Sequence, residues 1–189
     1  ISAKPVWLAG RETEVHLRVQ FKATVPAADE ATIYIATSGV YHLYVNGEFL
    51  AYGPARAGKG YFRVDEISLN GRLNTAENVV VLEVCGYNSS SFSIINQPSF
   101  VQAEILSGNK VLAATGTDFT ARVHPFLYRK TQRYSYQRPQ VEAYHIDYMD
   151  SFLTDRNSGT EPIAETEPKK LTKRRSPYPC YERVKAEPI

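Results

Sequence analysis

The sequence predicts an all-β fold, an antiparallel two-sheet β-sandwich or jelly roll that continues into an extended C-terminal arm. Most of the first 150 residues fall into short stretches in which hydrophobic and polar residues alternate, and β-branched and aromatic side chains are frequent there. Turn-forming residues separate these stretches, and no segment has the spacing of an amphipathic helix. With 189 residues and 43% hydrophobic content, the chain is long enough to bury one sizeable core.

The first four expected strands include a tight hairpin. They lie at residues 14–22, 32–38, 40–45 and 49–52. Alternation in the first of them predicts one hydrophobic face, formed by Val15, Leu17, Val19 and Phe21. The last two are joined by Asn46-Gly47, a pair that accepts the positive φ angles of a two-residue turn.

The remaining expected strands lie at residues 61–69, 78–85, 100–106, 110–114, 119–123 and 141–148. Asn70-Gly71 ends the first of these, and a Ser-Gly-Asn turn at residues 107–109 predicts a hairpin between the third and the fourth. Residues 78–85 are almost continuously apolar, which predicts a strand at the centre of a sheet.

A change in composition near the end of this region predicts a β-sandwich domain at residues 1–150 and a linker or extended arm at residues 151–189. Residues 154–179 are polar and contain four prolines, namely Pro162, Pro168, Pro177 and Pro179. One more strand is expected at residues 181–186. Because the chain begins with Ile1 and not with methionine, we expect a piece of a longer protein, in which the arm leads toward a missing downstream domain.

The charge distribution argues against polyanionic partners. The net charge is +2, and the positive and negative residues of positions 1–150 balance. Residues 128–138 interleave aromatic and basic side chains, a pattern that can bind single-stranded nucleic acid, but we favour a solvated strand or an arm against a neighbouring domain. No apolar run approaches the roughly 20 residues that cross a bilayer. We therefore expect neither nucleic acid nor a membrane as a partner.

The two cysteines have no metal-binding spacing. Cys85 lies in an apolar run, which predicts a small buried side chain. A disulfide with Cys180 is the alternative.

Histidines and acidic residues also give no metal site, and no cofactor is predicted. His16 and His42 are interpreted as polar-face members of strands, whereas His124 and His145 are isolated in the sequence. A structural calcium ion could use Asp65 or Asp118, but no Asp-rich loop indicates one.

A series of motifs resembles a known family. These are SGVYHLYVNG at residues 38–47, GPAR at 53–56, GYFRVDEISL at 60–69, ENVVV at 77–81 and CGY at 85–87, followed by similar segments at 133–144 and 175–179. The series resembles the N-terminal β-sandwich domain of bacterial α-L-rhamnosidases. One motif departs from the family, which often has Gly-Trp-Tyr where this chain has Gly86-Tyr87-Asn88.

The resemblance implies a galactose-binding-like sandwich that serves as a non-catalytic accessory module of a glycoside hydrolase. In that family the catalytic carboxylates belong to a downstream (α/α)6 barrel, so the implied partner is the catalytic domain of the same parent chain. A periplasmic or extracellular location in bacteria is implied as well. No catalytic residue is expected in this chain, since the resemblance places the catalytic carboxylates downstream. The adjacent carboxylates of Asp65 and Glu66, for example, point to opposite faces of a strand and cannot both face one ligand.

Two clusters are candidates for carbohydrate binding, which needs an aromatic platform beside hydrogen-bonding groups. The first is the loop that contains Tyr87, Asn88, Ser90, Phe92, Asn96 and Gln97. The second comprises Arg56, Tyr61 and Arg63. For Arg63 and Asp65, we favour the solvated face of a strand over ligand contact.

Two roles remain open within this family assignment. The module either binds glycans, such as those containing rhamnose, or acts as a structural spacer that supports the catalytic domain. The scattered positions of the 13 tyrosines favour the spacer slightly. An alternative of another class is an independent carbohydrate-binding or adhesion domain that is not attached to a hydrolase.

Overall fold

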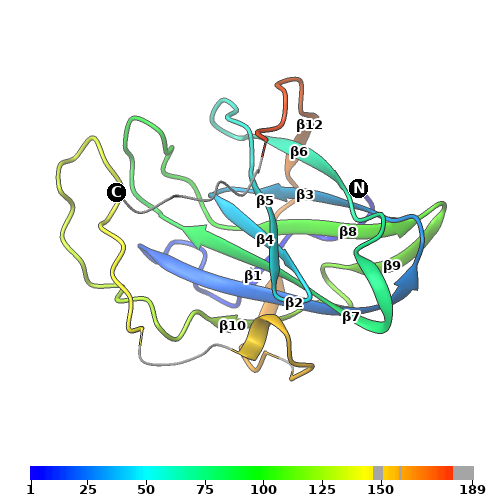
Figure 1. Cartoon of the computed structure of the whole chain (residues 1–189). Helices are drawn as coiled ribbons and strands as arrows, with labels where there is room; N and C mark the ends of the chain where they lie inside the picture. The colour runs from blue at the N-terminus through cyan, green and yellow to red at the C-terminus, as the bar shows by residue number, and fades with distance from the viewer. Residues whose placement is uncertain (147–150, 158, 181–189) are drawn as a thin grey trace, which may run out of the picture.

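Two β-sheets are layered face to face in the computed structural model, which describes residues 1–146, 151–157 and 159–180 (Figure 1). One sheet has seven strands and the other has five. The predicted all-β two-sheet sandwich is therefore confirmed. The one helical element within these ranges is a short 3-10 turn, η1 (Ser151–Leu153), and none of them holds a helix that could span a membrane.

The five-stranded sheet is antiparallel throughout. Its order is β10 (Thr120–Val123), β2 (Leu17–Ala28), β7 (Leu73–Gly86), β4 (Tyr41–Val45) and β5 (Glu48–Gly53). The apolar strand β7 lies between β2 and β4, at the centre of the sheet, as the sequence predicts.

The seven-stranded sheet is built from segments that lie far apart in the chain. Its order is β11 (Ile163–Glu165), β1 (Val6–Leu8), β8 (Val101–Ser107), β3 (Thr32–Thr37), β6 (Tyr61–Ser68) and β12 (Lys170–Lys173), with β9 (Lys110–Ala114) paired to β8. β6 and β12 run parallel, and the other pairs described in this sheet are antiparallel.

The hairpin between β4 and β5 turns at Asn46-Gly47. The φ angles of these residues are 51° and 84°, and Val45 pairs with Glu48 across the turn. Asn and Gly are the residues that enter this left-handed region most readily, so this pair determines where the hairpin turns.

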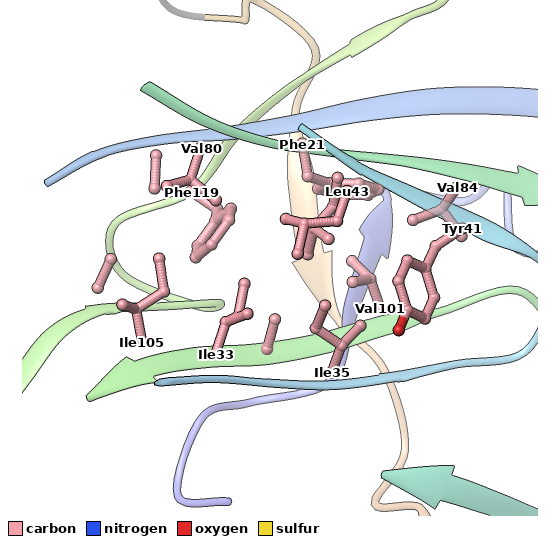
Figure 2. Packing of buried hydrophobic residues seen from close by; sticks show 14 of the residues in the cluster. Phe21, Ile33, Ile35, Tyr41, Leu43, Val80, Val84, Val101, Ile105 and Phe119 are labelled. Atoms are coloured by element: carbon pink, nitrogen blue, oxygen red, sulfur yellow. The ribbon is translucent and has the colours of Figure 1, made fainter. Parts of the chain in front are cut away.

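The core lies between the sheets and is filled by alternate residues of the strands. Figure 2 shows side chains from both layers meeting there, among them Phe21 and Leu43 from the five-stranded sheet and Ile33 and Ile35 from the seven-stranded sheet. Each of these is fully buried. Burial of one such side chain stabilises the fold by roughly 1.5–3 kcal/mol.

The predicted hydrophobic face of residues 14–22 is confirmed for Leu17, Val19 and Phe21, but not for Val15. Val15 is 48% exposed. The residue between it and the strand, His16, has a φ of 53°, which interrupts the extended backbone, and β2 begins only at Leu17. The alternation therefore does not extend back to Val15.

Residues 141–146 form no strand, so that part of the strand predicted at 141–148 is wrong. The backbone makes a single isolated bridge, between Leu127 and Tyr144. The backbone of this segment instead makes hydrogen bonds to residues 126–132, and its Glu142 and Tyr144 side chains contact Arg18 on the outer face of the five-stranded sheet. The rest of this prediction, and the strand expected at 181–186, lie outside the described residues.

The arm contributes two short strands to the larger sheet. β11 pairs with β1, and β12 pairs with β6. These strands span only three and four residues, too few to show a period in the sequence. The division into a domain at 1–150 and an arm at 151–189 stays a prediction.

Cys85 and Cys180 are not joined by a disulfide, so the disulfide alternative is wrong. Cys85 is buried and Cys180 is exposed. Burial raises the pKa of the Cys85 thiol to about 11, and the group is neutral at physiological pH.

Asp65 is fully buried, which corrects its interpretation as a residue of the solvated face. Tyr41 Oη donates a 2.6 Å hydrogen bond to Asp65 Oδ2, and Arg174 Nη1 donates one of 3.0 Å to Oδ1. A Cβ atom on Gly53 would lie 2.1 Å from Asp65 Oδ2, so only glycine fits there. This carboxylate joins both sheets and the arm.

Removal of Arg174 should therefore destabilise the fold strongly. The side chains of Arg174 and Asp65 are 8% and 1% exposed, whereas those of the surface pair Arg72–Glu48 are 46% and 66% exposed. We expect Arg174→Ala to lower the free energy of unfolding by about 3–5 kcal/mol, because it leaves a buried carboxylate without its cation. The control Arg72→Ala should lower it by less than about 1 kcal/mol.

Urea denaturation of both variants and the unchanged protein measures these free energies. Equal losses of unfolding free energy in Arg174→Ala and Arg72→Ala would contradict the conclusion that the Asp65 carboxylate links the two sheets and the arm.

Candidate functional site

A pocket of about 350 Å³ opens where three connections of the sandwich meet. Its walls are the turn between β3 and β4, the segment from the end of β5 to the start of β6, and the loop that follows β7. We call it the loop pocket. It is lined by residues at positions 37–40, 54–57, 61–63, 91–95 and 97.

The loop pocket brings together residues from both predicted clusters. Five of them line it, namely Arg56, Tyr61, Arg63, Phe92 and Gln97. The sequence identifies these residues separately but gives no sign that they share one site. The signal lies in the topology, because β3 is the neighbour of β6 and leads through the pocket-lining turn into β4.

Four other predicted residues do not line the loop pocket: Tyr87, Asn88, Ser90 and Asn96. Tyr87 is buried, and burial raises the pKa of its hydroxyl. Asn88 Nδ2 donates to the carbonyl of Glu14 at 2.9 Å and to Ser99 Oγ at 2.8 Å. Tyr87 and Asn88 thus fix the base of the loop that carries Phe92, and ligand contact by these four residues stays a prediction.

The walls of the loop pocket present aromatic faces and free donors. The Phe92 and Tyr61 side chains are 75% and 49% exposed. Gln97 Oε1 accepts a 3.3 Å hydrogen bond from Gly60 N, which leaves its amide donors available. Arg56 is exposed and makes no hydrogen bond or ion pair with the residues that the structure describes. This combination can hold a sugar by stacking and hydrogen bonding.

The pocket lacks the groups that hydrolysis of a glycoside uses. Among its described lining residues there is no aspartate or glutamate. Retaining and inverting glycosidases alike use a pair of carboxyl groups across the scissile bond.

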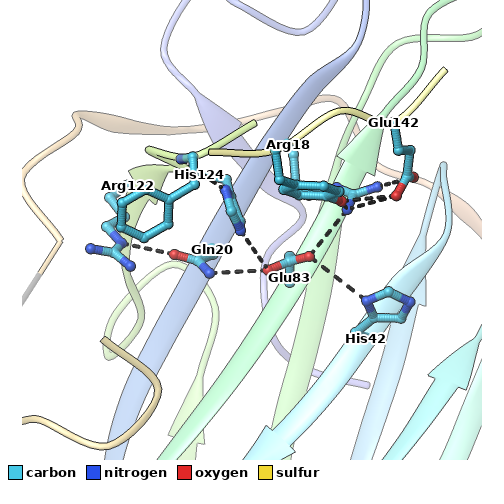
Figure 3. A network of polar contacts seen from close by, with 9 residues as sticks. Arg18, Gln20, His42, Glu83, Arg122, His124 and Glu142 are labelled. Atoms are coloured by element: carbon cyan, nitrogen blue, oxygen red, sulfur yellow. Dashed lines mark hydrogen bonds and ion pairs between the residues drawn. The ribbon is translucent and has the colours of Figure 1, made fainter. Parts of the chain in front are cut away.

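A second polar cluster lies on the outer face of the five-stranded sheet, and the sequence did not predict it (Figure 3). Its centre is Glu83 of β7, which is buried. Arg18 Nη1 lies 3.4 Å from Glu83 Oε1, and Gln20 Nε2 donates to Oε2 at 3.0 Å. His42 Nδ1 and His124 Nε2 lie 3.7 and 3.4 Å from the same carboxylate. His124 is thus part of a cluster, although it is isolated in the sequence.

The covering segment, residues 124–146, closes this cluster from outside. Arg18 forms an ion pair with Glu142 and a hydrogen bond with Tyr144, and Tyr144 Oη donates to Glu142 Oε2 at 2.8 Å. The His16 side chain, interpreted from the sequence as part of a polar face, is also buried, with Nδ1 3.2 Å from the carbonyl of Arg129. The polar face of β2 is therefore an internal surface.

The cluster holds its acids in the charged form. Burial alone would raise the pKa of Glu83, but the contact with His42 and the charges of His124 and Arg18 lower it overall. Burial would likewise raise the pKa of Glu142, and its contacts with Arg18 and Tyr144 lower it overall. Because these groups satisfy one another, we interpret the cluster as the contact that holds the covering segment on the sheet.

No metal site emerges from the described ranges. They contain no group of three or more His, Cys, Asp or Glu side chains that could hold an ion. Of the two aspartates considered for calcium, Asp65 is bound by Tyr41 and Arg174, and Asp118 Oδ2 accepts from Ala114 N at 2.8 Å and from Thr117 Oγ1 at 2.7 Å.

Comparison with solved structures places this fold within larger enzymes. The GH78 family rhamnosidase of Bacillus sp. GL1 matches with a TM-score of 0.77 and 21% identity over 94% of this chain and 20% of its own. The α-L-rhamnosidase from Dictyoglumus thermophilum matches at 0.65 with 14% identity, over 94% of this chain and 22% of its own. The α-L-rhamnosidase from Aspergillus terreus matches with a TM-score of 0.64 and 15% identity, over 91% of this chain and 22% of its own.

These matches define the class of the fold. The chain shares its all-β fold with a part of these three rhamnosidases, and it spans about a fifth of the length of each. No protein-family model matches the sequence, and no curated protein matches it.

The covering-segment contact should make the fold sensitive to acid. Because the pKa of Glu83 is lower in the folded protein, its stabilising contribution is present above the ordinary value of 4.5 and is lost as the pH falls below it. We expect Glu83→Gln to lower the free energy of unfolding at pH 7 by about 1–3 kcal/mol. The variant should also show a shallower loss of stability below pH 4.5 than the unchanged protein.

Denaturant titrations from pH 7 downward test this expectation. The control is Glu77→Gln, also on β7, because the Glu77 carboxylate pairs with Arg156 at the surface, where both side chains are at least half exposed. Parallel pH profiles for Glu83→Gln and the unchanged protein would show that Glu83 is not a stabilising centre.

Proposed function

We propose that this chain is a non-catalytic accessory β-sandwich domain of an α-L-rhamnosidase-like glycoside hydrolase, and that it binds carbohydrate in the loop pocket. Its partner in this proposal is the catalytic domain of the same parent chain. The parent would act in the periplasm or outside the cell, where glycan substrates are found.

One observation carries the binding role. Residues of two clusters that are separate in the sequence meet in one pocket with exposed aromatic faces and unused polar groups. Carbohydrate recognition combines such faces, which contact the apolar side of a sugar ring, with donors that contact its hydroxyls. This supports glycan binding over the purely structural spacer.

The accessory role rests on the likeness to rhamnosidases. The match to the Bacillus sp. GL1 enzyme covers nearly all of this chain but only 20% of that protein. A domain that small, with a pocket free of carboxylates, fits a supporting module better than an enzyme.

Titration with sugars tests the binding role. We expect L-rhamnose or rhamnose-containing oligosaccharides to bind with millimolar affinity in calorimetry. Phe92→Ala and Tyr61→Ala should each weaken binding about fivefold, because one aromatic contact contributes about 1 kcal/mol. Tyr136→Ala is the control, since this tyrosine is 74% exposed but lies outside the loop pocket.

A flat response to every sugar at millimolar concentration would remove the binding role. Binding that survives both pocket substitutions would place the site elsewhere on the domain.

The coding sequence on either side of this chain tests the accessory role. We expect several hundred further codons that specify paired helices and acidic residues, as a helical catalytic barrel requires. A stop codon directly after residue 189, or a membrane anchor, would favour an independent carbohydrate-binding or adhesion domain.

A further inference from the structure

We propose that the loop pocket is selective for an acidic sugar, and that Arg56 binds the carboxylate of a uronic acid residue. This inference rests on the proposed carbohydrate binding and adds the chemical class of the ligand. It starts from the charge of the lining, which includes two arginines and, among the described residues, no acidic side chain.

Arg56 is the free cation of the pocket. Its side chain is exposed and has no partner in the described part of the chain. It follows Gly53, whose position is set by close contact with the buried pair of Tyr41 and Asp65. A guanidinium presents parallel N–H donors that match the two oxygens of a carboxylate. Arg56 can therefore offer both donors to a ligand without first breaking an internal contact.

Arg63 adds a second positive charge that nothing inside the pocket neutralises. Its Nη1 donates to Thr172 Oγ1 at 3.3 Å and to the carbonyl of Lys173 at 3.0 Å. Both acceptors are neutral, so these bonds fix the guanidinium in place and leave its charge uncompensated. By contrast, the buried cations Arg18 and Arg174 each contact a carboxylate.

The surroundings of the pocket strengthen this charge. Lys170 Nζ lies 5.5 Å from the centre of the Tyr61 ring, which forms part of the wall. Lys169 does not contribute equally, because the nearby charges of Glu167 and Glu12 offset it. The charged groups described in the lining, and Lys170 beside it, are therefore positive, which favours an anion over a neutral sugar.

The aromatic side chains fit the same ligand. Phe92 and Tyr61 contact the apolar face of a sugar ring whether or not the sugar is charged. A carboxylate held by Arg56 adds a charge-assisted hydrogen bond, which a neutral sugar lacks. Selectivity for the acid should therefore depend on Arg56, and affinity for any sugar on the aromatic pair.

Calorimetric titration of the 189-residue chain with a matched pair of ligands tests the inference. One ligand is an oligogalacturonide, and the other is the same oligosaccharide with its carboxyl groups methyl-esterified. We expect the acid to bind about tenfold more tightly at low salt and to lose this advantage as the salt concentration rises. Arg56→Gln should weaken binding of the acid about tenfold and leave the ester unchanged.

The control is Arg72→Gln, which removes a charge paired with Glu48 outside the loop pocket. Equal binding of acid and ester would overturn the acidic-sugar inference and leave the proposed carbohydrate binding intact. Failure of both ligands and of L-rhamnose to bind would overturn the proposed function itself. A sulfated neutral oligosaccharide that binds as tightly as the uronate would overturn the assignment to a carboxylate.

Discussion

The buried carboxylate of Asp65 is the contact on which the arrangement of the sheets, the arm and the pocket depends. A charge removed from water is costly unless it is met by hydrogen bonds and an opposite charge. Tyr41 from the five-stranded sheet and Arg174 from the arm both meet it. The approach of Gly53 to the same carboxylate sets where the loop toward Arg56 begins. One charge thus positions three elements and a wall of the loop pocket.

A second set of charges explains why β2 is buried on both faces along most of its length. Its inner face packs on the core, and its outer face carries Arg18 and Glu83 beneath the covering segment. At the other end of the same face, Lys22 Nζ lies 2.7 Å from Asp155 Oδ1 and 3.5 Å from the centre of the Phe152 ring. The polar residues of β2 therefore bind later parts of the chain. In a solvated strand, the same residues would bind water.

The sequence was informative wherever local pattern decides structure. Alternation located β2 and β3, and the conformational freedom of Asn46-Gly47 located the hairpin. Prediction from the sequence failed where contacts between distant parts of the chain decide the structure. An alternating strand looks the same whether its polar face meets water or the covering segment, and the partners of Asp65 are distant in the chain. Individual residues of the loop pocket could be predicted from the sequence. That they line one pocket could not, because it depends on the order of the strands in the sheets.

Stability and recognition consequently fall on different residues of this domain. Charges in the interior, such as Arg174 and Glu83, are matched by partners, and a change at either disturbs the scaffold. The exposed groups of the loop pocket, Arg56 and Phe92, make few internal contacts, so a change there leaves the sandwich intact. Loops on a rigid β-scaffold can vary in this way because their side chains carry little of the folding free energy. The ligand of such a domain is therefore set by the chemistry of these loop side chains, while the core and the paired charges set the fold.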